Sequence, residues 1–345
     1  MPTVTASDTA SVLTAGLTTL RLGGPAARFV DARSAEEVVA ALRAARDDVL
    51  LVGGGSNLVI ADDGWPGTVV RVGSTGHTVV RDGASALVTA EAGTEWDALV
   101  AATVAEGLGG LECLSGIPGR TGATPVQNVG AYGVEIADLL VDVDLYDRRH
   151  DTVRTRVPAA ELGLAYRTSV LKGRTDAVVL RIRLRLTADA SSAPVRYAEL
   201  ARTLGVEQGA RVPAAAAREA VLGLRRGKGM VLDPADHDTW SVGSFFTNPV
   251  VDEERAPADA PRWPAADGQV KLPAAWLIER SGFARGHQGP GGRVALSTKH
   301  VLALTHRGGG RTEDLLALAR EVRDGVTTRF GIQLEPEPVL VGCHL

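Results

Sequence analysis

The alternation of hydrophobic and polar positions in the first third of the chain predicts strands and helices in turn. Ser34, followed by a glutamate three residues later, predicts the start of a helix with a periodic apolar face. An apolar strand at 48–52 then runs into the turn Gly53–Asn57, and the β-branched run at 58–60 is again strand-like. The glycine-rich phosphate loop of a Rossmann fold opens a helix, so this strand–turn–strand pattern argues against that fold.

Later segments predict further strands, helices and one long loop. Residues 141–145 and 178–186 alternate apolar residues with aspartates or arginines, which predicts two strands with one solvated face each. Residues 115–133 have neither helical nor strand period, and loops of this length are often functional. Other expected elements are a helix capped by Thr94, helices at 213–224, 273–280 and from Thr312, an irregular crossing at 232–240, and a final strand from Ile332.

Composition narrows the class of protein. The chain has 345 residues, enough for two or three domains, and its net charge of −4 gives no reason to expect nucleic-acid binding. Two cysteines are too few for a disulfide framework, and the sequence contains neither a signal-peptide pattern nor a long apolar span. We therefore expect a soluble, cytoplasmic protein. Of its 40 glycines, 17 lie between Gly53 and Gly133.

The two glycine-rich segments are candidates for binding a phosphate-containing ligand. Gly53–Asn57 offers consecutive backbone N–H groups, the geometry of an anion nest, although a triple glycine also makes an ordinary turn. The 115–133 segment adds glycines and hydrogen-bonding side chains that could wrap a large polar cofactor. Two such segments favour a long ligand over a single phosphate.

Three further groups could carry chemistry, each with a plainer alternative. Ser244 lies beside two phenylalanines but is not in a nucleophile elbow, and it could simply be a turn residue. Glu337 lies between prolines and could be a solvated edge residue, whereas Arg167 could clamp a carboxylate or do nothing of the kind. The seven histidines lack metal-ligand spacing, so we expect no metal site.

Read together, six segments resemble one enzyme family. They are GGGSNLVI, IPGRTGATPVQNVGAYG, AYRTSVLK, VGSFFTNP, ADGQVKLPAAWLIE and LEPEP, in this order along nearly the whole chain. Their order and separations resemble the UDP-N-acetylenolpyruvoylglucosamine reductase (MurB) family, in the subtype whose tyrosine loop closes over the substrate.

The resemblance implies an α+β fold with a two-part FAD-binding region of the vanillyl-alcohol-oxidase (PCMH) type and a third, substrate-binding domain. The expected bounds are 1–72 for the first FAD-binding subdomain, with 331–345 returning near the active site, 73–230 for the second, and 231–330 for the substrate domain. It also implies non-covalent FAD with NADPH as co-substrate, and a reaction that reduces UDP-N-acetylglucosamine enolpyruvate to UDP-N-acetylmuramate for peptidoglycan.

Matching the family motifs assigns roles to individual residues. Ser244 matches the proton donor, while Arg167 and Glu337, the latter as a protonated acid, would polarise the substrate carboxylate. Tyr197 matches the closing tyrosine, and Lys228 and Asn248 the diphosphate ligands. The positions matching FAD contacts are Gly53, Gly54, Gly55, Ser56, Asn57, Ile117, Gly119, Gly122, Thr124, Gln127, Asn128 and Gly133.

The chain departs from the family pattern at two positions. Many members have arginine at the position of Val339 and lysine at that of Thr247. Two alternatives stay open from the sequence: a flavin oxidoreductase of the same fold with another substrate, and a nucleotide-binding protein without catalysis. The expected partners are the enolpyruvyl substrate and NADPH, without nucleic acid or membrane, and we expect a monomer.

Overall fold

The computed structural model describes residues 12–345, which pack as two units. Unit 1 comprises Ala27–Gly54 and Pro66–Gly227, and unit 2 comprises Val12–Ala26, Gly55–Trp65 and Lys228–Leu345. Each unit has its own hydrophobic core. The domain bounds expected from the sequence stay a prediction, and residues 1–11 of the first expected subdomain lie outside the described residues.

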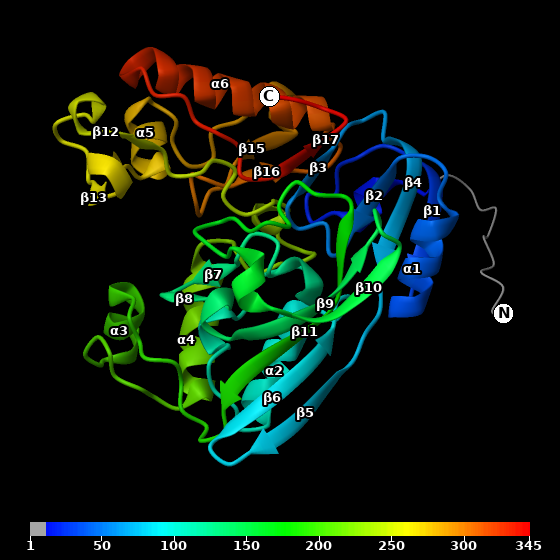
Figure 1. The fold of residues 1–345 in the computed structure, drawn as a ribbon. Coiled ribbons are helices and arrows are strands. Elements are labelled where there is room, and N and C mark those ends of the chain that lie inside the picture. The colour runs from blue at the N-terminus through cyan, green and yellow to red at the C-terminus, as the bar shows by residue number, and fades with distance from the viewer. Residues whose placement is uncertain (1–11) are drawn as a thin grey trace. The chain divides into compact units, whose positions relative to one another are not determined.

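Unit 1 is built on two sheets (Figure 1). The first has the order β1-β4-β2, formed by β1 (Ala26–Ala32), β4 (Trp65–Val72) and β2 (Val49–Val52), with β2 and β4 parallel. The second is antiparallel, in the order β10 (Thr152–Pro158), β9 (Leu140–Asp147), β11 (Ala177–Thr187), β6 (Ser85–Glu91) and β5 (His77–Asp82). A short hairpin joins β7 (Gly130–Ala131) to β8 (Val134–Glu135).

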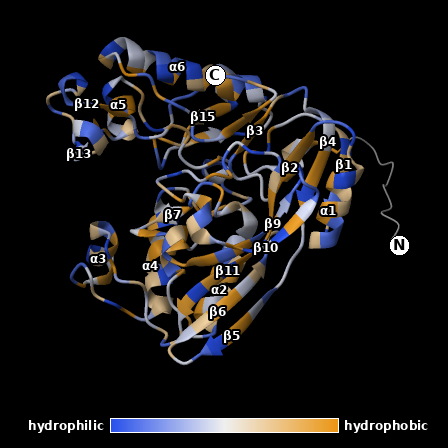
Figure 2. Ribbon diagram, in the orientation of Figure 1, coloured by the Kyte–Doolittle hydropathy of each residue, from blue (hydrophilic) through white to orange (hydrophobic). Residues whose placement is uncertain are grey.

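The helices of unit 1 contribute buried apolar side chains to its hydrophobic core. They are α1 (Ala35–Ala44), α2 (Trp96–Ala105), α3 (Ala198–Leu204) and α4 (Ala214–Gly227), with short 3₁₀ helices η2 (Glu112–Leu114) and η3 (Thr121–Ala123). Strand β2 is drawn in hydrophobic colours in Figure 2, as expected for a buried parallel strand. As the capping pattern predicts, the Ser34 hydroxyl accepts a hydrogen bond from the Glu37 N–H at the start of α1.

The arginine row of β11 is only in part the solvated face expected from the sequence, since Arg185 is exposed, Arg181 is half-buried and Arg183 is buried. Arg183 is 8% exposed, and its guanidinium donates to Asp142 at 2.5 Å and to Asp144 at 2.9 and 3.0 Å. The register places Arg183 opposite Asp142 and Arg181 opposite Asp144. Because opposite charges on neighbouring strands neutralise one another, this face can be buried. The alternation along one strand does not reveal the partner strand's charges.

Two expected element boundaries are also wrong. Thr94 does not cap the second helix; its hydroxyl bonds to Gly76, and α2 begins at Trp96 with Glu95 as the N-cap. The last strand, β17 (Val339–Val341), begins seven residues after Ile332. Pro336 and Pro338 have no N–H to give to a strand ladder, which delays regular pairing until both are passed.

Unit 2 collects segments that are far apart in sequence. Its β17 pairs in parallel with β3 (Leu58–Ile60), the strand that follows the glycine turn. The remaining strands form two sheets. One has the order β12 (Val250–Asp252), β14 (Gln269–Lys271) and β13 (Trp263–Pro264), and the other pairs β15 (Val294–Leu296) with β16 (Leu304–His306). The helices are α5 (Ala274–Arg280) and α6 (Thr312–Phe330), with 3₁₀ helices that include η1 (Thr14–Leu17) and η6 (His237–Thr239). Asp62 caps α6, since its carboxylate accepts the N–H groups of Thr312 and Glu313.

Candidate functional site

The two glycine-rich segments meet within unit 1. A Cβ added at Gly54 would lie 2.7 Å from the Cα of Gly119, so the two backbones approach more closely than any side chain allows. At Gly53 an added Cβ would meet only the side chain of Arg120, at 3.4 Å. The sequence predicted two separate glycine segments for one ligand, and the structure brings them into contact.

This contact leaves backbone donors available. Among the described residues, the N–H groups of Gly53, Gly54, Ile117, Gly119 and Arg120 donate to no other atom of the chain. All five residues are half-buried, so a ligand can reach them. Neighbouring N–H groups without a protein acceptor are suited to the oxygens of a diphosphate. The donor set therefore fits a dinucleotide such as FAD.

The rest of the first glycine turn belongs to unit 2. Gly55 has φ +59°, and a Cβ there would lie 2.0 Å from the Leu17 carbonyl oxygen, so only glycine fits. The Gly55 carbonyl accepts from the Thr19 N–H, while Ser56 and Asn57 lead into β3. These contacts fix the exit of the turn.

The remaining expected cofactor residues lie in the long 115–133 segment, and several hold it together. The Gly122 N–H donates to the Ala92 carbonyl, and the Thr124 hydroxyl to that of Thr121. The Asn128 amide donates to Glu135 and Ala165 and accepts from the Ala137 N–H. Gln127 is half-buried, and Gly133 is exposed with φ +84°. The Thr124 and Asn128 side chains thus act on the shape of the loop.

Arg167 and Tyr197 both lie against the end of this segment. The Arg167 guanidinium donates to the Gly130 carbonyl at 2.9 Å, and its backbone has φ +52°, unusual for a residue other than glycine. The Tyr197 ring packs edge-on against Tyr132, with 5.4 Å between ring centroids. Unit 1 therefore brings the candidate arginine and the candidate closing tyrosine to the same loop.

Ser244 and Glu337 are brought together within unit 2. The Glu337 N–H donates to the carbonyl of Phe245 at 2.9 Å, and Phe246 forms an antiparallel bridge with Pro336. Just beyond Glu337, the Val339 N–H donates to the Asn57 carbonyl at 2.9 Å. The candidate serine, the candidate acid and the exit of the glycine turn thus lie on adjacent backbone segments. Among the described residues, none forms a hydrogen bond with the half-buried Ser244 hydroxyl, so a ligand can use it.

Asn248 and Lys228 also belong to unit 2. The Asn248 side-chain oxygen accepts the Ala274 N–H at the start of α5, and its amide nitrogen donates to no atom of the described chain. Lys228 lies near His300, whose pKa falls to about 4 because of burial and the positive charges of Lys228 and Arg285. Two cations beside a neutral imidazole make an electropositive group suited to an anion. Arg285 was not predicted; its sequence position carries no motif, whereas Lys228 stood out as one of few lysines.

The two departures from the family pattern have defined places. Thr247 donates its N–H to the Glu335 carbonyl at 3.0 Å, and the Val339 side chain is 47% exposed in β17. No group of histidine, cysteine or carboxylate side chains in residues 12–345 is arranged to hold a metal ion. Over the same residues, no helix has both the length and the apolar character needed to cross a bilayer.

Comparisons with known proteins agree with these features. Two family models match: "FAD binding domain" over residues 26–156, and "UDP-N-acetylenolpyruvoylglucosamine reductase, C-terminal domain" over residues 233–341. The chain is 62% identical to the UDP-N-acetylenolpyruvoylglucosamine reductase of Saccharopolyspora erythraea, over 99% of this chain and 97% of that protein. It is 58% identical to the protein of the same name from Nocardia farcinica, over 97% and 90% of the two chains.

A solved structure matches as well. The crystal structure of UDP-N-acetylenolpyruvylglucosamine reductase (MurB) from Thermus caldophilus aligns with a TM-score of 0.66 and 25% sequence identity. The alignment covers 96% of this chain and 98% of that one, so the similarity extends over both units.

Proposed function

Because this chain belongs to the UDP-N-acetylenolpyruvoylglucosamine reductase family, we propose that it reduces UDP-N-acetylglucosamine enolpyruvate to UDP-N-acetylmuramate with NADPH and FAD. The observation that carries this proposal is 62% identity over 99% of the chain to a protein of that name. The α+β fold with an FAD-binding region, expected from the sequence, is confirmed by the family match and the solved relative.

The backbone of unit 1 supports FAD as the cofactor. The N–H groups of Gly53, Gly54, Ile117 and Gly119 would hold its diphosphate, since residues 12–345 supply no acceptor for them. Bound FAD would supply two-electron transfer from NADPH to the enolpyruvyl double bond. The residues around it would orient the substrate and manage the accompanying proton.

We assign Ser244 as the residue that donates a proton to the substrate. Adding hydride to the terminal carbon leaves negative charge on the carbon that bears the carboxylate, and this carbon must then receive a proton. The Ser244 hydroxyl is not held by the described chain and can donate to substrate. A serine is a weak acid, so it needs charge or water beside it. The hydrogen bond from the Glu337 N–H to the Phe245 carbonyl supports a role for the Glu337 carboxyl group close to Ser244.

Glu337 and Arg167 would stabilise the developing charge on the substrate carboxylate. An arginine suits this task because its planar guanidinium matches a carboxylate and stays charged. The Arg167 hydrogen bond to Gly130 supports an arginine held in place by residues 115–133, the cofactor loop. Glu337 can help only as a protonated donor, because a second carboxylate would repel the first.

The other assignments concern binding. Lys228 and Asn248 would hold the UDP diphosphate, and we add His300 and Arg285 because they share the electropositive group of Lys228. Tyr197 would close over the substrate. The subdomain bounds 1–72, 73–230 and 231–330, a monomeric state and a cytoplasmic location complete the proposal.

This function can be tested by following two half-reactions of the purified protein, which are flavin reduction by NADPH and flavin reoxidation by the enolpyruvyl substrate. The protein should carry flavin absorbance that bleaches anaerobically with NADPH and returns when the enolpyruvyl substrate is added. Ser244→Ala should leave bleaching unchanged and slow the return about 10²-fold or more, as expected for loss of a general acid. Ser281→Ala is the matched control, because it removes a buried hydroxyl without a hydrogen-bond partner among the described residues.

Each contrary result points to a named alternative. A colourless protein would favour a nucleotide-binding protein without catalysis. A bleached flavin that ignores the substrate would favour an oxidoreductase acting on another compound. Equal loss of both half-reactions in the Ser244 variant would refute its role as proton donor.

A further inference from the structure

Residues 188–213, the Tyr197 loop, leave β11 and return to α4 with both ends held. Thr187 and Gly109 exchange two backbone hydrogen bonds of 3.0 Å. The Ala190 N–H donates to the Gly107 carbonyl at 2.9 Å, and the Ala214 N–H donates to that of Ala190 at 2.8 Å. The base of the loop is therefore fixed to the segment that precedes the cofactor loop.

Above this base the two arms of the loop pair with each other and form a neck. The Ser192 N–H donates to the Val212 carbonyl at 2.7 Å, and the Val195 N–H to that of Ala210 at 2.9 Å. Tyr197 follows directly, as the N-cap residue of α3. The position of the Tyr197 ring is thus set by the position of the neck.

One buried carboxylate reaches this neck from outside the loop. The Glu112 side chain is 0% exposed, with one oxygen accepting the Gly110 N–H at 2.6 Å and the other the Ala193 N–H at 2.5 Å. Arg211 holds the same neck through a 2.8 Å bond to the Ser192 carbonyl. Burying a carboxylate costs free energy. An apolar side chain would fill the same space at a lower cost in free energy if Glu112 served only for packing.

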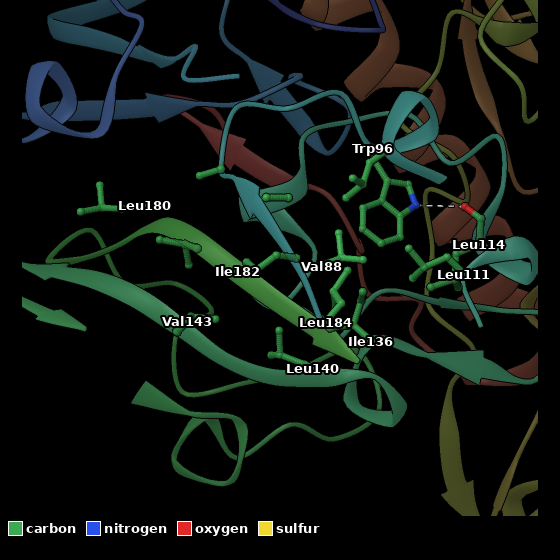
Figure 3. Packing of buried hydrophobic residues seen from close by; sticks show 14 of the residues in the cluster. Val88, Trp96, Leu111, Leu114, Ile136, Leu140, Val143, Leu180, Ile182 and Leu184 are labelled. Atoms are coloured by element: carbon green, nitrogen blue, oxygen red, sulfur yellow. Dashed lines mark hydrogen bonds between the residues drawn. The ribbon is translucent and has the colours of Figure 1, made fainter. Parts of the chain in front are cut away.

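Glu112 is itself firmly placed. It lies on η2, immediately before the cofactor loop, and its neighbours Leu111 and Leu114 pack around Trp96 (Figure 3). The indole N–H of Trp96 donates to the Leu114 carbonyl at 3.0 Å. The Glu112 side chain is therefore fixed relative to the cofactor loop, and the neck that it holds is fixed relative to the same loop.

We propose that Glu112 is a positioning residue that ties the Tyr197 loop to the cofactor loop, so that Tyr197 is presented at Tyr132 when substrate binds. The proposal rests on the proposed function in one respect, the assignment of Tyr197 to the substrate. A carboxylate that only stabilised η2 would affect unfolding and flavin retention, but not substrate KM selectively.

Glu112→Gln tests the tie while keeping the side chain's size. The glutamine amide has one acceptor oxygen and one N–H₂ group. The N–H₂ group faces a backbone N–H and cannot accept a hydrogen bond from it, so one of the two anchoring bonds is lost. Asp62→Asn is the matched control, because the Asp62 carboxylate also accepts two backbone N–H groups but belongs to unit 2, which contains no part of the loop. Arg211→Met offers a second, exposed change at the same neck in case the buried variant does not fold.

Two readouts separate the outcomes. In Glu112→Gln, deuterium exchange should accelerate in peptides covering 193–210, and substrate KM should rise about tenfold, as for one lost charge-assisted bond. Flavin reduction by NADPH should be unchanged, and Asp62→Asn should alter neither readout. In a Tyr197→Ala background, Glu112→Gln should raise KM no further, because both changes act through one ring.

Unchanged exchange in the neck of Glu112→Gln would overturn the proposal. Faster exchange with an unchanged substrate KM would also overturn it, by showing that the tie does not serve the substrate. Failure of the wild-type protein to reduce the enolpyruvyl substrate would instead refute the proposed function, and the exchange measurement would still decide whether Glu112 anchors the loop.

Discussion

The close approach of Gly54 to Gly119 makes a sharp prediction about FAD binding. Gly54→Ala adds one methyl group whose carbon would lie 2.7 Å from the Gly119 Cα, and the neighbouring atom is backbone rather than a side chain that can turn away. Gly54 does not have a positive φ, so alanine suits its backbone conformation. The effect of the substitution is therefore steric and local, and the two turns must separate.

The size of the effect follows from the overlap. Ordinary contact for a Cβ begins at 3.4 Å, so the turns must separate by several tenths of an ångström. Overpacking of this kind costs about 1–3 kcal/mol. FAD would need both turns in place, whereas the free protein can relax, so we expect the strain to weaken cofactor binding. The dissociation constant for FAD should rise roughly 5- to 150-fold.

Gly223→Ala is the matched control for this experiment. It adds the same methyl group within α4, outside both glycine-rich segments, where the added carbon would meet no other atom within 4 Å. Both variants can be titrated with FAD after removal of bound cofactor, using flavin fluorescence, and their unfolding followed in urea. The reasoning is wrong if Gly54→Ala binds FAD like wild type, or if Gly223→Ala weakens binding equally.

The remaining predictions concern stability and substrate binding. The pKa of His300 is lowered to about 4 from 6.5, so unfolding takes up a proton between these values and stability falls as pH drops through them, by up to about 3 kcal/mol. His300→Gln should flatten that part of the pH profile in urea unfolding. Arg183→Met should cost about 3 kcal/mol, because it removes the closest cation from two buried aspartates, whereas Arg154→Met at an exposed pair should cost less than about 1 kcal/mol in the same assay. Tyr197→Phe should raise substrate KM in steady-state kinetics; an unaltered KM would refute contact through its hydroxyl.

Much of the fold could be predicted because local signals agree with it. The strand before Gly53 and the strand after Asn57 are short β-branched runs separated by glycine, and both form as expected. The burial of Arg183 could not be predicted, since it depends on which residues the neighbouring strand places opposite it. The strand over Ala26–Ala32 also has no clear periodic pattern, and only its pairing with β4 makes it regular.

The candidate site also has some residues that the sequence predicts and others that it does not. The two glycine clusters can be recognised from the sequence as candidates for close approach to a ligand, because glycine has no side chain to keep the backbone away. The pairing of Phe245 with Glu337 joins segments far apart in sequence, and no local pattern encodes it. Glu112 was missed because a lone glutamate before a loop usually lies on the surface. Its zero exposure depends on a loop that begins some eighty residues later.

The pairing of β17 with β3 has a consequence for biosynthesis. Unit 2 combines residues 12–26 and 55–65 with everything after Lys228, whereas most of unit 1 is the continuous stretch 66–227. During translation the central stretch can collapse while β3 still lacks its partner, because β17 emerges after every other strand. The segment that carries Glu337 therefore joins after the other described strands, and a chain cut short before this segment would leave β3 exposed as an unpaired strand.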